Sequence, residues 1–209
     1  MGYTGNMASS AGKIFVMRHA TPTNPRRVMY GNLAGFPLSD LGRQQASEAG
    51  QWLSRYSLRH IISSPRERTH QTADVVLNMN PGHPDIVTDE RLRDVDLGIA
   101  TGVVSMDDFH RRRQYYWESQ ERQVDGMEAP RITQARMLAV FEEMCRRYSG
   151  ESLLFVSHAD PMAFLFQGLL NQLLMPSVGS GWGITKASIF EIQLSPRVII
   201  KKVFQPTEQ

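Results

Sequence analysis

Two short apolar runs in this chain each lead into a histidine, and this repeated arrangement constrains the fold more than any other feature of the sequence. Residues 13–17 (KIFVM) run into Arg18-His19, and residues 152–156 (SLLFV) run into Ser157-His158. Short apolar runs of this kind are typical of buried strands. The sequence therefore predicts two buried strands whose ends carry imidazole side chains.

Further strand-like and helical patterns alternate along the rest of the chain. Helical spacing of apolar residues predicts helices over 39–56 and 132–148 and helices that begin at Pro65 and Pro161, with Ser64 and Asp160 as their N-caps. Strands are expected over 60–63 and 85–88, and an antiparallel edge hairpin over 187–194 and 197–204. This alternation predicts the α/β class, as a three-layer α/β/α fold with a mostly parallel central sheet. Ligands of such folds collect at the carboxyl ends of the strands, where His19 and His158 fall.

The domain organisation follows from the same patterns. Residues 1–12 (MGYTGNMASSAG) carry neither a signal-peptide pattern nor a myristoylation motif, and we expect a disordered leader there. Residues 13–209 are expected to form a single domain. Residues 103–130 are polar and rich in arginine, which favours a helical cap inserted into that domain.

Composition limits the partners and the compartment. The formal net charge of +2 is too small to indicate nucleic acid binding, and the longest apolar stretch, 162–174, is too short and too polar to span a membrane. The single cysteine, Cys145, excludes a disulfide framework within the chain and a cysteine-based zinc site. We therefore expect a cytoplasmic protein with no cofactor; the oligomeric state is not encoded in any pattern of the sequence.

Three sequence elements carry candidate chemistry. Arg18-His19 follows a predicted strand, and an imidazole placed there can be a nucleophile, a general base, a metal ligand or a structural residue. Arg68 follows the strand at 60–63, one turn into a helix, and helix N-termini bind anions. His158 again stands between a strand and a helix, where an imidazolium can donate to a phosphoryl oxygen. Together these elements make an anion pocket that suits phosphate.

Phosphoryl transfer needs several fixed donors, an in-line nucleophile and an acid for the leaving oxygen. Arginine outnumbers lysine 19 to 4 in this chain, and the guanidinium group binds phosphate in a two-pronged way that lysine cannot copy. Genome composition explains the total equally well, so only the placement of individual arginines is informative. Asp94 and Asp96, in a loop after a predicted strand, are both candidates for the acid.

These motifs, taken in order, resemble the histidine phosphatase superfamily, in its phosphoglycerate-mutase-like branch. RHA at 18–20 resembles the family's R-H-G, SSPRERTHQTA at 63–73 its S-S-P-x-x-R-A-x-x-T-A, and SHA at 157–159 its S-H-G. FPLSDLGRQQA at 36–46 and GMEAPRITQAR at 126–136, with Glu128 and Arg136, match two further patterns of the family. The departures are Ala20 and Ala159 for glycine and Thr69 for alanine. The resemblance extends from about Lys13 to Leu194.

The resemblance implies a role for each matching residue. His19 would be the nucleophile that is transiently phosphorylated, and Arg18, Arg68 and His158 would bind the phosphoryl group, His158 also counting among the catalytic residues. Asp94 stands in LRDVDLG where the family has a glutamate as general acid, and aspartate is one methylene shorter. No metal is expected in this site.

Contacts with the rest of the substrate are assigned more loosely. Asn24 comes one residue earlier than the asparagine of the true mutases, and Arg26 and Arg27 follow in the same loop. These three residues are candidates for substrate binding. A solvated helix face is the favoured interpretation of Arg111–Arg113.

The leading hypothesis is a phosphomonoesterase of the histidine acid phosphatase type, which hydrolyses a small phosphorylated metabolite through a phosphohistidine on His19. The first alternative is a phosphoglycerate-type mutase, which the RHATPTNP sequence disfavours because it lacks the E-S-x-W-N context of the mutases. The second alternative is a non-catalytic protein that binds a phosphorylated ligand on the same fold. A metallohydrolase is disfavoured because His19 and His158 have no further histidine or paired carboxylates nearby at metal-ligand spacing.

Overall fold

A six-stranded mixed sheet forms the centre of the protein. The computed structural model describes residues 12–102, 120–123, 125–177 and 180–207. The strands, in the spatial order β3-β2-β4-β1-β5-β6, are β3 (Asp85–Thr88), β2 (His60–Ser63), β4 (Leu153–Ser157), β1 (Ile14–Arg18), β5 (Ile189–Gln193) and β6 (Ile199–Phe204). β3, β2, β4 and β1 are parallel to one another, and β5 and β6 complete the sheet as an antiparallel edge hairpin. The predicted hairpin and the mostly parallel core of the sheet are confirmed.

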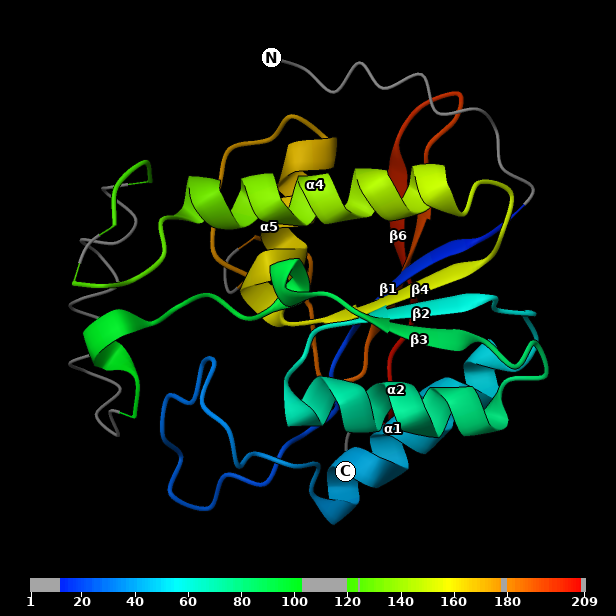
Figure 1. The fold of residues 1–209 in the computed structure, drawn as a ribbon, viewed down its shortest axis with the longest axis horizontal. Helices are drawn as coiled ribbons and strands as arrows, with labels where there is room; N and C mark the ends of the chain where they lie inside the picture. Colours follow the sequence, from blue (N-terminus) through cyan, green and yellow to red (C-terminus); the bar gives the residue numbers. More distant parts are fainter. Residues whose placement is uncertain (1–11, 103–119, 124, 178–179, 208–209) are drawn as a thin grey trace.

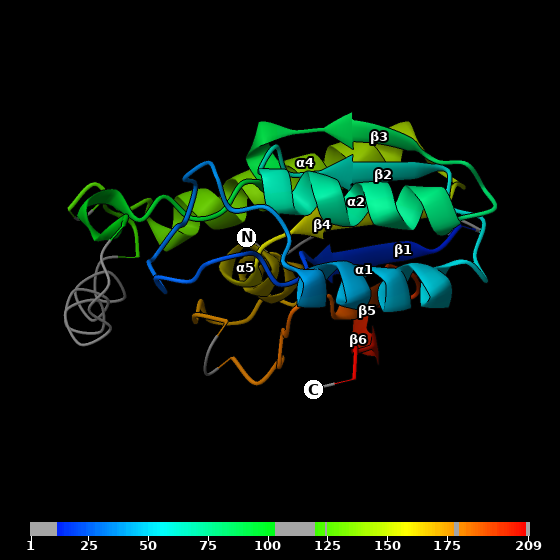
Figure 2. The same cartoon turned by 90° about the horizontal axis from the view of Figure 1, so that it is seen from below.

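Helices cover both faces of this sheet. The described α-helices are α1 (Asp40–Leu53), α2 (Glu67–Met79), α4 (Pro130–Arg147) and α5 (Ala159–Leu169). Figure 1 shows α1 and α2 on one face and α4 and α5 on the other, and Figure 2 looks onto the sheet from the side that α1 and α2 cover. Alternate residues of a strand point to opposite faces, so Val16 and Phe155 pack toward α4 and α5, whereas Phe15 and Leu154 pack toward α1 and α2. The predicted three-layer α/β/α architecture is confirmed.

The strand register fixes where the ends of the central strands lie. Arg18 at the end of β1 pairs with Ser157 at the end of β4, and Ser63 at the end of β2 pairs with Val156 of β4. Because the three strands are parallel and in this register, the residues that follow them emerge side by side at one edge of the sheet. Two histidines and the start of α2 therefore meet there.

Two predicted helix starts are wrong. α2 begins at Glu67 rather than Pro65, with Arg66 at its N-cap and no side-chain cap bond. The Ser64 hydroxyl lies 2.9 Å from His158 Nε2 and is 3.5 Å from the N–H of Arg66. α5 begins at Ala159 rather than Pro161 with His158 at its N-cap, so Asp160 lies in the first turn and does not cap it. Its carboxylate accepts instead from the backbone N–H of Ser177 at 2.7 Å. In both cases a long-range partner took the side chain that local sequence assigned to a cap.

Two predicted segments lie largely outside the described residues. These are the leader at 1–12, of which Gly12 is described, and the cap at 103–130 with Arg111–Arg113, of which 120–123 and 125–130 are described. The described end of the cap segment contains turns, and α4 starts at Pro130. Within the described parts of the chain, no helix has the length and apolar character to cross a membrane.

Candidate active site

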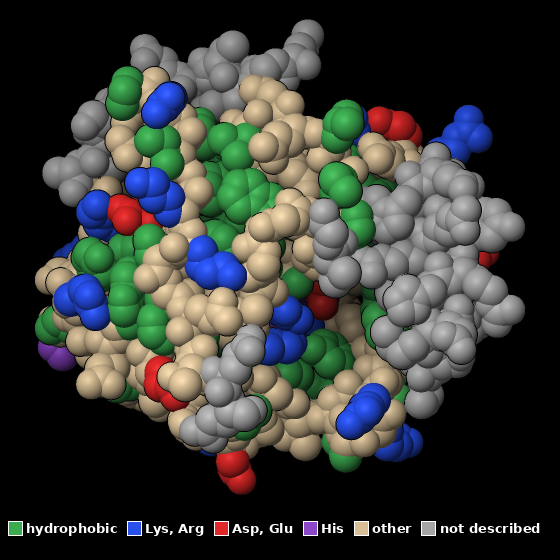
Figure 3. Space-filling view, turned by 180° about the vertical axis from the view of Figure 1, so that it is seen from behind, with side chains coloured by type: hydrophobic (Ala, Val, Ile, Leu, Met, Phe, Trp, Pro, Cys, Tyr) green, Lys and Arg blue, Asp and Glu red, His purple; other side chains and the backbone are tan. Residues whose placement is uncertain are grey.

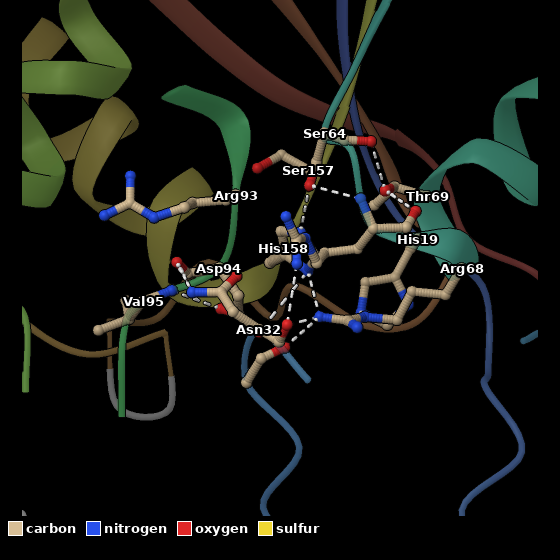
Figure 4. Close-up of polar contacts among 12 residues, drawn as sticks. His19, Asn32, Ser64, Arg68, Thr69, Arg93, Asp94, Val95, Ser157 and His158 are labelled. Carbon is tan, nitrogen blue, oxygen red and sulfur yellow. Dashed lines mark hydrogen bonds and ion pairs between the residues drawn. The ribbon is translucent and has the colours of Figure 1, made fainter. Parts of the chain in front are cut away.

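The ends of β1, β2 and β4 bring His19, Arg68 and His158 into one cluster. Backbone bonds continue the sheet past the strand ends, from His19 N to Ser157 O at 3.0 Å and from Ser64 N to Val156 O at 3.0 Å. The two imidazole ring centres lie 5.2 Å apart, and Arg68 reaches both rings from the first turn of α2 (Figure 4). His19, Arg68 and His158 are each at most 2% exposed. Segments about 140 residues apart in the sequence thus converge on one buried position.

The hydrogen bonds of His19 determine which ring nitrogen has the lone pair. Nδ1 lies 2.7 Å from the carbonyl oxygen of Ala20, which can only accept, so Nδ1 carries the proton. Nε2 then has the lone pair, and it accepts from Arg68 Nε at 3.2 Å. Burial, followed by the positive charges of Lys186 and Arg68, lowers the pKa of His19 well below its usual range. The His19 imidazole is therefore a neutral base with a directed lone pair, which is the form a nucleophile requires.

Arg68 is a hub of polar contacts. Its Nη2 donates to Gly31 O at 2.7 Å, lies 3.1 Å from His158 Nδ1 and lies 3.4 Å from Asp94 Oδ2. The ring of Tyr30 stacks on its guanidinium group at 4.6 Å. These contacts fix the planar fork in position beside the Nε2 atom of His19.

Arg18 supplies a buried donor that the chain does not use. Its Nη1 donates to Ile184 O at 2.9 Å, while its Nε is buried and has no hydrogen-bond partner. A buried donor without a partner is costly, and an anion in the adjoining cavity would satisfy it. Burial also lowers the pKa of Arg18, as expected for a cation that no carboxylate fully compensates.

His158 differs from its expected state. Its Nε2 lies 2.9 Å from the Ser64 hydroxyl, and its Nδ1 accepts from Arg68. Burial and the positive charge of Arg68 lower the pKa of His158 well below its usual range, so these neighbours disfavour the expected imidazolium. The position of His158 agrees with a phosphoryl-binding role, but its charge would depend on a nearby anion.

Of the two candidate acids, Asp94 faces the cluster. Its Oδ1 accepts from the N–H of Val95 at 2.9 Å, and its Oδ2 lies 3.4 Å from Arg68 Nη2 and 3.6 Å from His158 Nδ1. Asp96 is exposed. Burial raises the pKa of Asp94 although Arg68 opposes the shift, and a raised pKa favours the protonated form that an acid needs.

A buried ion pair holds the loop that carries Asp94. Arg136 of α4 donates to Glu128 from Nε and Nη2, at 2.8 Å each, and to the backbone oxygens of Arg93 and Asp94 at 2.8 and 3.1 Å. Glu128 and Arg136 match the family pattern, and the structure places them beside the backbone of Asp94. They position Asp94 through its main chain and do not reach the His19 ring.

A cavity of about 390 Å³ opens beside His19 and Asp94. Figure 3 shows a hollow on this side of the molecule, with Lys or Arg side chains and an acidic side chain at its wall. Asn24 and Arg27, two of the candidates for substrate binding, are among the lining residues, although the Asn24 amide also bonds to the backbone of Val28. Arg26 is exposed and is not among the residues that line the cavity. Apolar lining comes from Val28, Met29, Val95 and Leu97.

Sequence reasoning missed two residues that contact the cluster, Lys186 and Tyr30. Lys186, in the loop before β5, places Nζ 3.4 Å from His19 Nε2 and 3.0 Å from the hydroxyl of Tyr30. Neither residue stands at a strand end that the resemblance identified, so no motif indicated them. No local pattern of the sequence marked either residue. Below, the set Arg18, His19, Arg68, His158 and Lys186 is called the cationic pocket.

The described residues include no group of three or more His, Cys, Asp or Glu side chains that could hold a metal ion. The predicted metal independence of the site stays a prediction, because it concerns activity.

Comparison with known sequences agrees with this geometry. The family model for the histidine phosphatase superfamily (branch 1) matches residues 14–199. The phosphoserine phosphatase 1 of Hydrogenobacter thermophilus is 25% identical over 193 residues, which cover 90% of each chain. A probable phosphoglycerate mutase GpmB of Salmonella choleraesuis is 28% identical over 163 residues, 76% of this chain and 74% of that protein.

Solved structures show the same fold. YhfR of Bacillus stearothermophilus aligns with a TM-score of 0.78 at 23% identity, over 92% of this chain and 96% of that one. A mycobacterial glucosyl-3-phosphoglycerate phosphatase in complex with VO3 aligns with a TM-score of 0.77 at 23% identity, over 91% and 98% of the two chains. The family match spans every strand that delivers a residue to the cationic pocket, and the chain belongs to branch 1 of the histidine phosphatase superfamily.

Proposed function

We propose that this protein is a phosphomonoesterase of the histidine acid phosphatase type that hydrolyses a small phosphorylated metabolite through a phosphohistidine on His19. The observation that carries this proposal is the tautomer of His19, whose Nε2 lone pair points at the donors of Arg68 while Nδ1 is bound to a carbonyl. A nucleophile, fixed cations and a carboxyl group of raised pKa are the parts that phosphoryl transfer needs.

The first half of the reaction forms the phosphoenzyme. His19 Nε2 attacks phosphorus in line with the ester oxygen, the P–N bond forms and the P–O bond breaks. Asp94, protonated in this step, gives its proton to the departing oxygen, so the alcohol leaves neutral. Arg18, Arg68 and His158 hold the non-bridging oxygens, and the unsatisfied Nε of Arg18 gains its missing acceptor.

The second half regenerates the enzyme. The Asp94 carboxylate accepts a proton from water, which attacks phosphorus and breaks the P–N bond. Inorganic phosphate leaves, His19 Nε2 recovers its lone pair, and Asp94 is again protonated. One water is consumed for each ester, and neither half needs an electron acceptor.

A mutase is the competing function, because one relative carries that name. A mutase must hold a second phosphate group while the first is on the histidine. Among the cavity-lining side chains that are described, the cations are Arg18, beside His19, and Arg27, which is exposed; Val28, Met29 and Leu97 are apolar. This lining favours release of phosphate over its return to a second site. We therefore expect phosphate release to exceed the interconversion of 2- and 3-phosphoglycerate.

The central experiment is rapid-quench trapping of a covalent phosphoenzyme with His19→Ala as the test variant. The wild type should give an acid-labile, base-stable phosphoenzyme, and His19→Ala should lose both the phosphoenzyme and the turnover of p-nitrophenyl phosphate. His83→Asn is the matched control, since His83 is exposed and its positive φ suits asparagine. Near-wild-type turnover by His19→Ala would refute the proposal.

Two further properties are part of the proposal. Activity on a panel of phosphorylated metabolites should survive EDTA, because arginine and histidine donors supply the positive charge that a metal would bring. Activity lost to EDTA and restored by zinc or magnesium would point to a metallohydrolase.

We also propose a cytoplasmic setting, which the single buried cysteine, Cys145, supports.

A further inference from the structure

Lys186 reaches the reacting atom of His19 from the antiparallel side of the sheet. It lies in the loop between α5 and β5, and its Nζ is 3.4 Å from His19 Nε2. A second contact joins Nζ to the hydroxyl of Tyr30 at 3.0 Å, and the ring of Tyr30 lies 5.8 Å from Nζ. Lys186 is thus held at two points in a position where no motif placed a residue.

The groups around Lys186 are mostly positive. The cations near it are Arg18 at the end of β1 and Arg68 of α2, and the neutral bases are His19, directly after β1, and His158 at the β4–α5 junction. The negative group that acts on it is Asp94, and the Tyr30 hydroxyl is the polar neighbour. Burial and the charges of Arg18 and Arg68 lower the pKa of Lys186 well below its usual range. A third cation beside Arg18 and Arg68 is costly to the free protein.

Resting on the hydrolase function proposed above, we propose that Lys186 is a phosphoryl-binding residue, whose ammonium group moves from His19 Nε2 to a non-bridging oxygen of the substrate. The geometry requires such an exchange, because the lone pair of Nε2 must be vacated before it can attack phosphorus. Arg68 Nε and Lys186 Nζ both approach that lone pair, at 3.2 and 3.4 Å. A phosphoryl group in line with Nε2 would place its oxygens where these donors now point.

Protonation then couples to binding. A dianionic phosphoryl group stabilises the ammonium form of Lys186, so the protein should take up a proton when it binds an oxyanion above neutral pH. A bound anion also favours protonation of His158, but the pKa of that imidazole is lowered well below an ordinary value of only 6.5, whereas the ordinary pKa of Lys186 is 10.5. Lys186 is therefore the group expected to gain the proton above neutral pH. Oxyanion affinity should therefore fall as pH rises above neutral, and the fall should belong to Lys186.

A purely structural role makes a different prediction. If Lys186 served only to anchor the loop of Tyr30, its loss would lower stability and leave the pH dependence of oxyanion binding unchanged. The Tyr30→Phe variant separates the two roles, because it removes the 3.0 Å contact and keeps the ring over Arg68. Phosphoryl binding predicts that Tyr30→Phe keeps the alkaline fall in affinity.

The test is calorimetric binding of tungstate, an oxyanion whose charge is constant above neutral pH, to the full chain. Lys186→Met should weaken tungstate binding about 100-fold near neutral pH, in line with the loss of one fixed donor to a transferring group, and should abolish the alkaline fall. Lys186→Arg should keep the binding to higher pH. Lys201→Met is the matched control, since Lys201 is exposed on β6, and it should bind as the wild type does.

A labelling measurement covers the case in which a Lys186 variant does not fold. Pyridoxal 5′-phosphate followed by borohydride should label Lys186 in the wild type, and tungstate should protect it. Lys13, Lys201 and Lys202 complete the set of lysines and should show no protection. Equal protection of all four, or no label at Lys186, would overturn the inference.

The outcomes separate this inference from the proposed function. Weakened tungstate binding by Lys186→Met, together with no hydrolysis by any form of the protein, would uphold the oxyanion contact and refute the hydrolase. Hydrolysis through His19 with unchanged tungstate binding in a folded Lys186→Met would refute the contact alone. Hydrolysis that falls in Lys186→Met in parallel with tungstate binding supports both.

Discussion

Two groups of arginines lie on either side of Asp94, and they differ in how their charge is compensated. In the first group, here called the Arg136 cluster (Arg91, Arg93, Arg136 and Glu128), each guanidinium meets a carboxylate of the chain: Arg91 pairs with Asp89 and Glu143, and Arg93 and Arg136 pair with Glu128. In the cationic pocket, by contrast, Asp94 is the one carboxylate in ion-pair range of Arg68 among the described residues. The other contacts of Arg68 are the imidazoles of His19 and His158, the carbonyl of Gly31 and the ring of Tyr30.

The pKa shifts follow the same division. Bonds to Asp89 and Glu143 raise the pKa of Arg91, whereas burial lowers the pKa of Arg18 and of Arg68. Removing the carboxylate from a buried cation that is paired within the chain destabilises the fold, while a buried cation without such a partner is costly until an anion binds. The two groups of arginines therefore share a residue type but differ in the number of carboxylates nearby. It is this difference that distinguishes an arginine paired within the chain from one able to bind an external anion.

The largest effect on stability should come from the Arg136 cluster. Glu128→Gln keeps the shape of the side chain but leaves Arg136 as a buried charge with no carboxylate, which typically costs about 3–5 kcal/mol of the free energy of unfolding. Denaturant unfolding followed by circular dichroism measures it. Glu121→Gln is the matched control, because the Glu121 pair with Arg131 is exposed and should contribute about 0–1 kcal/mol. Similar losses in the two variants would remove the basis of the comparison.

The cationic pocket should show the opposite balance. Arg68→Lys keeps the charge but loses the fork that contacts Gly31 and both histidines, so kcat/KM should fall about 10²–10³-fold. The free energy of unfolding should change less than in Glu128→Gln. Steady-state kinetics on p-nitrophenyl phosphate is the measurement, with the exposed Arg43→Lys as control. Wild-type kinetics for Arg68→Lys would argue against phosphoryl binding by this residue.

Asp94 lies between the two groups, with its backbone held by Arg136 and its carboxyl directed at Arg68. If it is the acid, Asp94→Asn should slow hydrolysis of alkyl phosphates by about 100-fold, since a poor leaving group needs protonation. Hydrolysis of p-nitrophenyl phosphate, whose leaving group departs as an anion, should slow by no more than a few-fold. Asp96→Asn, at an exposed position of the same loop, serves as control. Equal slowing of both substrates, or a selective loss in Asp96→Asn, would assign the proton to another group.

The smallest effect concerns stability against pH. His19 and His158 have folded pKa values below the unfolded value near 6.5, so below that pH the unfolded chain binds protons that the folded chain does not. Stability should therefore fall with falling pH from about 6.5, by at most about 1.4 kcal/mol per pH unit for each histidine. Denaturant unfolding at several pH values tests this. His158→Gln should flatten the slope and His83→Asn should not; unchanged slopes in both would contradict it.

The layers and the strand ends were predictable because they depend on local patterns. A buried strand shows itself as an apolar run, so β1, β2 and β4 and the residues that follow them could be identified directly. The parallel arrangement then required His19, Arg68 and His158 to meet at one edge. The family assignment followed from the same segments, and the match over residues 14–199 confirms it.

The errors occurred where a side chain had a choice of partners. Ser64 can cap a helix by local rules, but His158 from a distant strand took its hydroxyl, and Asp160 likewise turned to the loop at Ser177. Arg26 and Arg27 are neighbours in one loop, and Arg27 lines the cavity whereas Arg26 does not; substrate binding by either residue stays a prediction. Such competition has no local signature, because the competing partner lies far away in the sequence.

The sequence by itself thus determined the fold class, which follows from periodicity. It also named His19, Arg18 and Arg68 as site candidates, through their places at strand ends and a helix start and through the family resemblance. The tertiary structure decided that Asp94 and not Asp96 faces the pocket, that burial and Arg68 lower the pKa of His158, and that Lys186 contacts His19. The physical reason is that burial and electrostatics depend on the sum of all nearby groups. The burial and the electrostatic surroundings of these residues are therefore fixed only when β1, β4, α2 and the loop before β5 have packed together.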